Sequence, residues 1–168
     1  KAASWLLRAS LKSEWHESFS TFVELDHVET TFDDDHSDGV RFNEQPVIPD
    51  TRGSDLNQAW LAANIGSLAF RFGRQVLEFD NQRFIGSVSF WQNEQSFDAL
   101  HVKADWLSAS SASYTYIDNA NRIFGDDADP TLSLDDSIYA ATNGVRPAGR
   151  LGDHEQNTHL FRVEINEW

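Results

Sequence analysis

The chain has 168 residues, the size of one domain, and its 13 basic and 27 acidic residues give a formal net charge of −14. So negative a chain is not expected to bind nucleic acid, which requires clustered Lys and Arg, but it suits a secreted, surface or cation-binding protein. The absence of Cys excludes a disulfide framework and a thiolate metal site. The absence of Met leads us to expect that Lys1 is not the start of the gene product. We treat residues 1–168 as a single domain.

Apolar and polar residues alternate along most of the chain, and no apolar run approaches the roughly 18 residues of a membrane helix. In the second such stretch, for example, Val23 and Leu25 have one parity while Glu24 and Asp26 have the other. A period of two predicts β-strands, and we find no convincing helix. About seven strands are predicted, in chain order at residues 4–13, 19–28, 56–64, 68–73, 97–104, 109–119 and 159–166.

The predicted connections alternate in length. Short ones at 14–17, 64–67 and 105–107 alternate with long ones at 32–55, 75–95 and 119–156. This alternation is typical of an all-β, antiparallel up-and-down transmembrane β-barrel with short periplasmic turns and long extracellular loops. A soluble β-sandwich, specifically a secreted carbohydrate-binding module with or without calcium, is the alternative that the pattern leaves open.

Three neighbouring motifs carry a resemblance to a known family. They are Gly73-Arg74-Gln75, residues 80–86 (DNQRFIG) and residues 92–99 (QNEQSFDA), and weaker matches lie at 22–25, 56–59 and 118–127. Together they resemble the alginate-export family of outer-membrane porins. In that family an Arg usually precedes the QNEQ motif, whereas this chain has Trp91.

The resemblance implies a barrel in a Gram-negative bacterial outer membrane with considerably more strands than this chain provides. We therefore expect an N-terminal or central portion of such a barrel, closed by the remainder of the barrel or by other chains. The expected partners are outer-membrane lipid and a hydrophilic solute or anionic polysaccharide. The expected function is passage of such a solute, including uronate-like or oligosaccharide-like anions, through a polar lumen.

If the apolar parity faces lipid, the opposite parity lines the lumen and sets its selectivity. An anionic uronate polymer requires a basic constriction, and the planar guanidinium of Arg is well suited to carboxylates. The alternative is that each Arg only neutralises a neighbouring acid. The candidate pore-lining residues are Glu24, Asp26, Arg71, Arg74, Arg83, Arg122 and Arg162.

Acidic clusters occur in two of the long predicted loops. Flexible loops rich in carboxylates can bind Ca²⁺, which takes six to eight oxygen ligands. The alternative is a solvated acidic loop without a metal. The candidate ligands are Asp34, Asp38, Asp126 and Asp127. No other cofactor is predicted.

No catalytic arrangement stands out, because the His residues are scattered and no nucleophile or phosphate-binding motif is present. We therefore do not expect an enzyme. Trp60, Trp91 and Trp106 could stack on sugars in a sandwich. In a barrel, aromatic residues near strand ends instead form the interfacial girdle. The girdle candidates are Trp5, Trp15, Trp106 and Tyr116.

Overall fold

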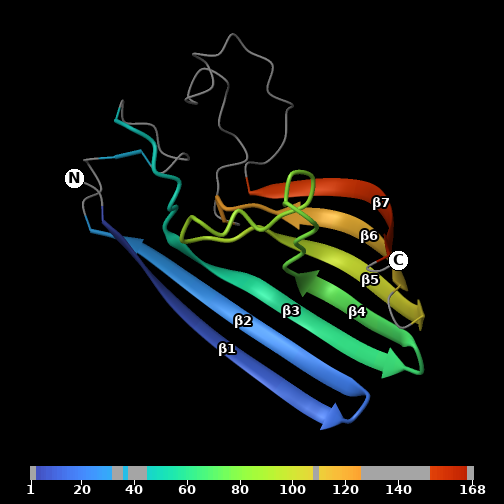
Figure 1. The fold of residues 1–168 in the computed structure, drawn as a ribbon. Helices are drawn as coiled ribbons and strands as arrows, with labels where there is room; N and C mark the ends of the chain where they lie inside the picture. Colours follow the sequence, from blue (N-terminus) through green and yellow to red (C-terminus); the bar gives the residue numbers. More distant parts are fainter. Residues whose placement is uncertain (1–2, 32–35, 38–44, 108–109, 126–151, 166–168) are drawn as a thin grey trace.

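The computed structural model describes residues 3–31, 36–37, 45–107, 110–125 and 152–165, and the strands among them form one antiparallel sheet. Each strand pairs with the next strand along the chain (Figure 1). The strands are β1 (Ser4–His16), β2 (Phe19–Thr30), β3 (Gly53–Ile65), β4 (Leu68–Gln75), β5 (Ser96–Leu107), β6 (Ser110–Asn121) and β7 (Asp153–Ile165). The prediction of an all-β, up-and-down arrangement of seven antiparallel strands is confirmed. Within these ranges, no helix has the length and apolar character to cross a membrane.

The connections separate by length onto the two ends of the sheet (Figure 1). The short ones comprise residues 17–18, 66–67 and 108–109, and the long ones comprise residues 31–52, 76–95 and 122–152. Gly66 has a φ of +61°, the left-handed conformation that a tight two-residue hairpin requires. The alternation of short and long connections is thus as predicted.

Several strands are longer than predicted. β1 continues through His16 and β5 through Leu107, both of which were expected in turns, while β3 begins at Gly53 and β7 at Asp153. The predicted ends lay where the apolar alternation stops. The backbone ladder continues further because its hydrogen bonds do not depend on the polarity of the side chains.

The two faces of the sheet differ in polarity, and it is the apolar face that is exposed, whereas most soluble proteins bury theirs. On β2, Val23 and Leu25 are 43% and 54% exposed, whereas Glu24 and Asp26 are only 7% and 4% exposed. We call the side that carries Val23 and Leu25 the apolar face and the side that carries Glu24 and Asp26 the polar face. Exposed large side chains of the apolar face are Trp5, Leu7, Leu11, Trp15, Phe19, Val23, Leu25, Leu56, Leu61, Ile65, Leu68, Phe72, Phe161, Val163 and Ile165.

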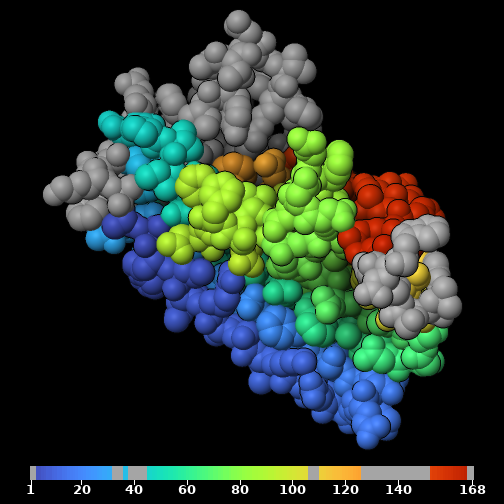
Figure 2. All heavy atoms as spheres, viewed as in Figure 1, coloured from blue at the N-terminus to red at the C-terminus, as the bar shows by residue number. Residues whose placement is uncertain are grey.

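The connection between β4 and β5, residues 76–95, lies over the polar face of the sheet, and we call it the inner segment (Figure 2). Beneath it Leu77 packs with Phe97 and Ile117 in a small buried cluster. Phe79 and Ile85 of the same segment border this cluster. The apolar core of the described residues therefore sits between the inner segment and one half of the sheet, rather than between two sheets.

Candidate functional site

A network of ion pairs lies on the polar face near the long connections. Arg8 and Asp26 face each other in the β1–β2 register, and the guanidinium donates to both carboxylate oxygens at 2.8 and 2.7 Å. Nη1 of the same Arg8 donates to Glu94 of the inner segment at 3.0 Å. One Arg therefore links the wall of the sheet to the segment that lies across it.

A β-bulge brings more polar groups into this network. Glu24 pairs with Gln58 and the next residue, Leu25, pairs with Leu56, so Asn57 is an extra residue on β3. Asn57 Nδ2 donates to Glu24 Oε1 at 2.9 Å and to Glu94 Oε2 at 3.4 Å. Without the bulge, regular alternation would turn either Asn57 or Gln58 to the apolar face. Both instead donate to Glu24, Gln58 at 3.0 Å.

The last part of the inner segment is also fixed to the residues before β3. The backbone N–H of Gln92 donates to Asp50 Oδ1 at 3.0 Å, and Asn93 Nδ2 donates to the Thr51 carbonyl at 3.1 Å. Asp50 in turn accepts a hydrogen bond of 2.5 Å from Ser4 at the start of β1. This end of the segment is thus held by several polar contacts, most of them at least half-buried.

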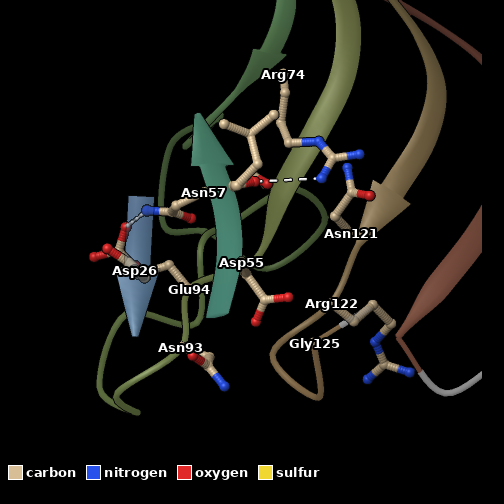
Figure 3. A pocket seen from close by; sticks show the side chains of 11 residues that line it. Asp26, Asp55, Asn57, Arg74, Asn93, Glu94, Asn121, Arg122 and Gly125 are labelled. Atoms are coloured by element: carbon tan, nitrogen blue, oxygen red, sulfur yellow. Dashed lines mark hydrogen bonds between the residues drawn. The ribbon is translucent and has the colours of Figure 1, made fainter. Parts of the chain in front are cut away.

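These groups surround a small polar cavity (Figure 3). In this view Asp26, Asn57 and Glu94 lie on one side, Arg74 and Asn121 on the other, and Asp55 between them. The cavity volume is about 20 Å³, which is enough for one water molecule and too little for a sugar ring. The network therefore fixes the inner segment and is not itself a solute site.

Arg74 is engaged at the end of β4. Its Nε and Nη2 donate to the two oxygens of Asp98 at 3.0 and 3.2 Å, and Asn121 donates to the same Asp98 at 3.2 Å. The preceding Gly73 has a φ of +118°, and a Cβ there would lie 2.3 Å from the carbonyl oxygen of Ala59. Only glycine fits where β3 and β4 approach this closely, and this position comes directly before Arg74 in the chain.

The first part of the inner segment contacts β7, the strand at the other edge of the sheet from β1. Arg162 on β7 contacts Asp80 at 2.6 Å and its strand neighbour Glu164 at 2.5 Å. The same guanidinium lies 5.8 Å from the ring centre of Phe79. The inner segment thus crosses the polar face (Figure 2). It contacts β7 with Asp80 and β1 with Glu94.

Arg71 has a different environment. Its guanidinium carbon lies 4.6 Å from the centre of the Trp60 ring, and Trp60 stacks on Phe22 at 5.3 Å with 24° between the planes. The β3–β4 register explains this contact, because Arg71 pairs with Ala62, two residues from Trp60 on the same face. Among the described residues, no carboxylate forms an ion pair with Arg71. A half-buried guanidinium in this state can accept an anion from outside the chain.

The remaining candidate residues are separated from these groups. Arg122 lies 5.5 Å from the ring centre of Phe124 and borders the small cavity. Arg83 is exposed on the inner segment, where its backbone N–H donates to Asn81 Oδ1 at 3.2 Å. Glu24 and Asp26 meet at the network, whereas Arg71, Arg83 and Arg162 lie at three other places.

The calcium candidates Asp34, Asp38, Asp126 and Asp127 all lie outside the described residues. Within the described ranges, no group of three or more His, Asp or Glu side chains is arranged to hold a metal ion. The calcium prediction therefore stays a prediction.

The tryptophans occupy different environments. Trp5 and Trp15 are exposed on the apolar face at opposite ends of β1, and the Trp15 indole donates to Thr21 at 3.1 Å. Trp60 lies on the polar face beneath Arg71. Trp91, where the family resemblance leads one to expect Arg, packs against the buried Ile123 and Phe124. The side chain of Trp106 lies outside the described residues.

Sequence reasoning did not find Glu94 or Asn57 as members of the site, and it considered Trp60 only as a residue that could stack on sugars in a sandwich. Their partners come from other strands, and the bulge that exposes Asn57 to Glu24 leaves no mark in the alternation. A signal was nevertheless present. A predicted connection as long as 75–95 without secondary structure is unusual in a compact domain and often functional.

Comparison with known families agrees with this geometry. The sequence profile described as alginate export matches residues 6–131. The chain belongs to the alginate export family. No curated protein and no solved structure matches it.

The match to the alginate export family covers β2–β6, most of β1 and the whole inner segment, while β7 lies beyond it. All the residues that line the small cavity therefore lie in the matched part. The contact between Arg162 and Asp80 joins the matched part to β7.

Proposed function

We propose that this alginate export protein forms part of a channel in a bacterial outer membrane that passes a hydrophilic, anionic solute. The observation that carries the proposal is the inversion of the sheet, with its apolar face exposed and its polar face buried where the inner segment lies over it. In water such a face would be a large aggregation-prone surface. Against lipid the same face is stabilising, because each large apolar side chain that leaves water contributes roughly 1.5–3 kcal/mol.

The dimensions of the sheet support a membrane location. Six of the seven strands have 12 or 13 residues, and a tilted strand needs about 9–11 to span a bilayer. Trp5 and Trp15 are exposed near the two ends of β1, where an interfacial girdle would lie. A carbohydrate-binding sandwich would instead bury its apolar face under a second sheet, and the described residues form one sheet only.

Closure of the sheet belongs to the same proposal. β1 and β7 are its two edge strands, and a bilayer offers no water to satisfy their free backbone groups. We therefore propose that further strands, from the remainder of the barrel or from other chains, pair with both edges. The polar face then becomes the wall of a lumen, and the inner segment lies within it.

The preference for anions rests on Arg71. The described acidic side chains neutralise Arg8, Arg74 and Arg162, so these contribute little net potential to a passing solute. Among the described residues Arg71 has an aromatic neighbour and no acidic one, and a positive charge in such surroundings attracts carboxylates. The solute class that fits is a carboxylate-bearing saccharide. The proposal is of transport and contains no catalytic step.

Membrane fractionation followed by planar-bilayer recording tests the proposed function. The protein should be used as its source makes it, including any strands beyond this chain. We expect it in the outer-membrane fraction, soluble only with detergent, and producing stepwise, anion-preferring conductance. A monodisperse protein that needs no detergent and gives no conductance would contradict the proposal.

A further inference from the structure

Phe84 and Phe90 of the inner segment lie outside the buried clusters beneath it, although the Phe90 ring lies 4.8 Å from the ring of Trp91. Phe84 is 90% exposed and Phe90 is 77% exposed, whereas Phe79 and Trp91 of the same segment pack against buried clusters. An exposed phenylalanine gives up the stabilisation that burial of its ring in a neighbouring cluster would provide. Both belong to the segment that faces the viewer in Figure 2.

A hollow lies between these two side chains. It has a volume of about 420 Å³ and is lined by Gln82, Arg83, Phe84, Phe90 and Gln95, among others. Sites for small organic ligands commonly have volumes of about 300–1,000 Å³ and combine apolar walls with a few polar groups. This hollow, unlike the 20 Å³ cavity, therefore has room for a sugar ring.

The backbone around the hollow is strained and well held. Val88 has a φ of +56°, a left-handed conformation that is unfavourable for a β-branched residue. The Gln95 backbone N–H donates to Ser87 at 2.6 Å, Gln95 Nε2 donates to Gly86 at 3.0 Å, and the Ser87 hydroxyl donates to Glu78. Strain of this kind persists only where surrounding contacts impose it, and it is common at binding sites. The backbone that carries the walls of the hollow is thus held in place before a ligand arrives.

The chemistry of the lining indicates which ligand fits. The C–H faces of a pyranose ring pack on the electron-rich face of an aromatic ring, and Phe84 and Phe90 provide two such faces. Arg83 can donate two parallel hydrogen bonds to a carboxylate, and no described side chain forms an ion pair with it. The amides of Gln82 and Gln95 can donate to and accept from hydroxyl groups.

We propose that this hollow is a binding subsite for an acidic sugar residue, with its ring against Phe84 and Phe90 and its carboxylate on Arg83. The inference rests on the proposed function. It names the class of solute, and it places the binding of that solute at residues other than Arg71. The inner segment then supplies both an obstruction across the polar face and a recognition surface on it.

Titration calorimetry of the detergent-solubilised protein tests the subsite without requiring transport. The probes are a hexameric oligogalacturonate and the neutral maltohexaose. We expect the double variant Phe84→Ala, Phe90→Ala to bind the acidic hexamer about tenfold more weakly, a change of about 1.4 kcal/mol. Arg83→Gln should lose the preference for the acidic over the neutral hexamer, and Arg83→Lys should retain part of it.

Phe161→Ala is the matched control, because it removes an equally exposed phenylalanine from the apolar face of β7. It should bind the acidic hexamer and conduct salt as the unmodified protein does. Unchanged binding by the double variant would overturn the subsite. So would a large loss of thermal stability in that variant alone, because it would mean that Phe84 and Phe90 pack against other strands.

The two proposals can fail separately. A protein that conducts salt, but whose double variant binds the acidic hexamer normally, retains the proposed function and loses the subsite. A protein without conductance, whose binding still depends on Phe84, Phe90 and Arg83, retains the subsite and loses the channel.

Discussion

At the scale of single residues, Arg71 differs from Arg8, Arg74 and Arg162 in what surrounds its guanidinium. Arg8, Arg74 and Arg162 each contact a carboxylate at 3.0 Å or less, whereas Arg71 lies over Trp60. The sequence left open whether each Arg merely neutralises a neighbouring acid. This alternative describes Arg74 and Arg162 well and does not describe Arg71.

Arg71→Gln should reduce the preference of the channel for anions over cations by about fivefold. A unit charge close to a passing ion contributes ~1 kcal/mol where water is present, and 1.4 kcal/mol corresponds to a factor of ten. Reversal potentials in a salt gradient measure this preference. Arg71→Lys keeps the charge and should keep most of the preference, so equal losses in both variants would contradict a charge effect.

Gly73→Ala should destabilise the sheet by about 3 kcal/mol, because the added Cβ meets the Ala59 carbonyl oxygen and φ is +118°. Gly66→Ala is the control, since φ there is +61° with no atom within 4 Å of the added Cβ. It should cost only about 1–2 kcal/mol. Urea unfolding in lipid vesicles measures both free energies. A larger loss at Gly66 would contradict the close approach of β3 and β4.

At the scale of structural elements, the inner segment is held differently at its two ends. Near Glu94 it forms charged and amide contacts with β1 and β3, while near Asp80 it forms an exposed ion pair with β7. Between these ends Leu77 and Trp91 join separate apolar clusters. At position 91, where the family resemblance leads one to expect Arg, Trp attaches the segment to the connection after β6.

Removing both ionic contacts with Asp80→Asn and Glu94→Gln should loosen the inner segment without unfolding the sheet. Exposed ion pairs contribute up to about 1 kcal/mol each, so amide hydrogen exchange in residues 80–94 should become about tenfold faster. Glu14→Gln removes an ion pair with Lys12 at the far end of β1 and should leave this exchange unchanged. Equal protection in both variants would show that the apolar clusters alone hold the segment.

At the scale of the whole molecule, the sheet has two uncompleted surfaces, its apolar face and the edges formed by β1 and β7. Lipid would cover the first and additional strands the second. The first requirement follows from the free energy gained when apolar side chains leave water, and the second from the absence of hydrogen-bonding solvent in a bilayer. A soluble protein with these surfaces would aggregate through the same two features.

Leu11→Lys tests the environment of the apolar face. Leu11 lies near the middle of β1, opposite Val23, and is 71% exposed. In a bilayer the lysine should destabilise folding by about 2–4 kcal/mol, whereas at an exposed position in water it should cost less than about 0.5 kcal/mol. Ser10→Lys places the same side chain on the polar face and is the control. Unfolding in vesicles measures both, and equally small losses would argue against lipid contact.

The sequence by itself determined the strand number, the order of short and long connections and, away from the bulges, the face on which a strand residue lies. It could do so because a period of two and the spacing of turns are local properties. The motifs at 73–75, 80–86 and 92–99 likewise pointed to the family that the profile match establishes. Strand ends were less accurate, because pairing continues beyond the apolar alternation.

Only the tertiary structure decided which charges neutralise one another. Arg8 and Glu94 are 86 positions apart, and their contact depends on the path of a segment without regular structure. The bulge at Asn57 and the stacking of Arg71 on Trp60 depend on the register between strands. The exposure of Phe84 and Phe90 likewise follows from how the inner segment folds over the sheet, because side-chain contacts between distant parts of a chain leave no local pattern in the sequence.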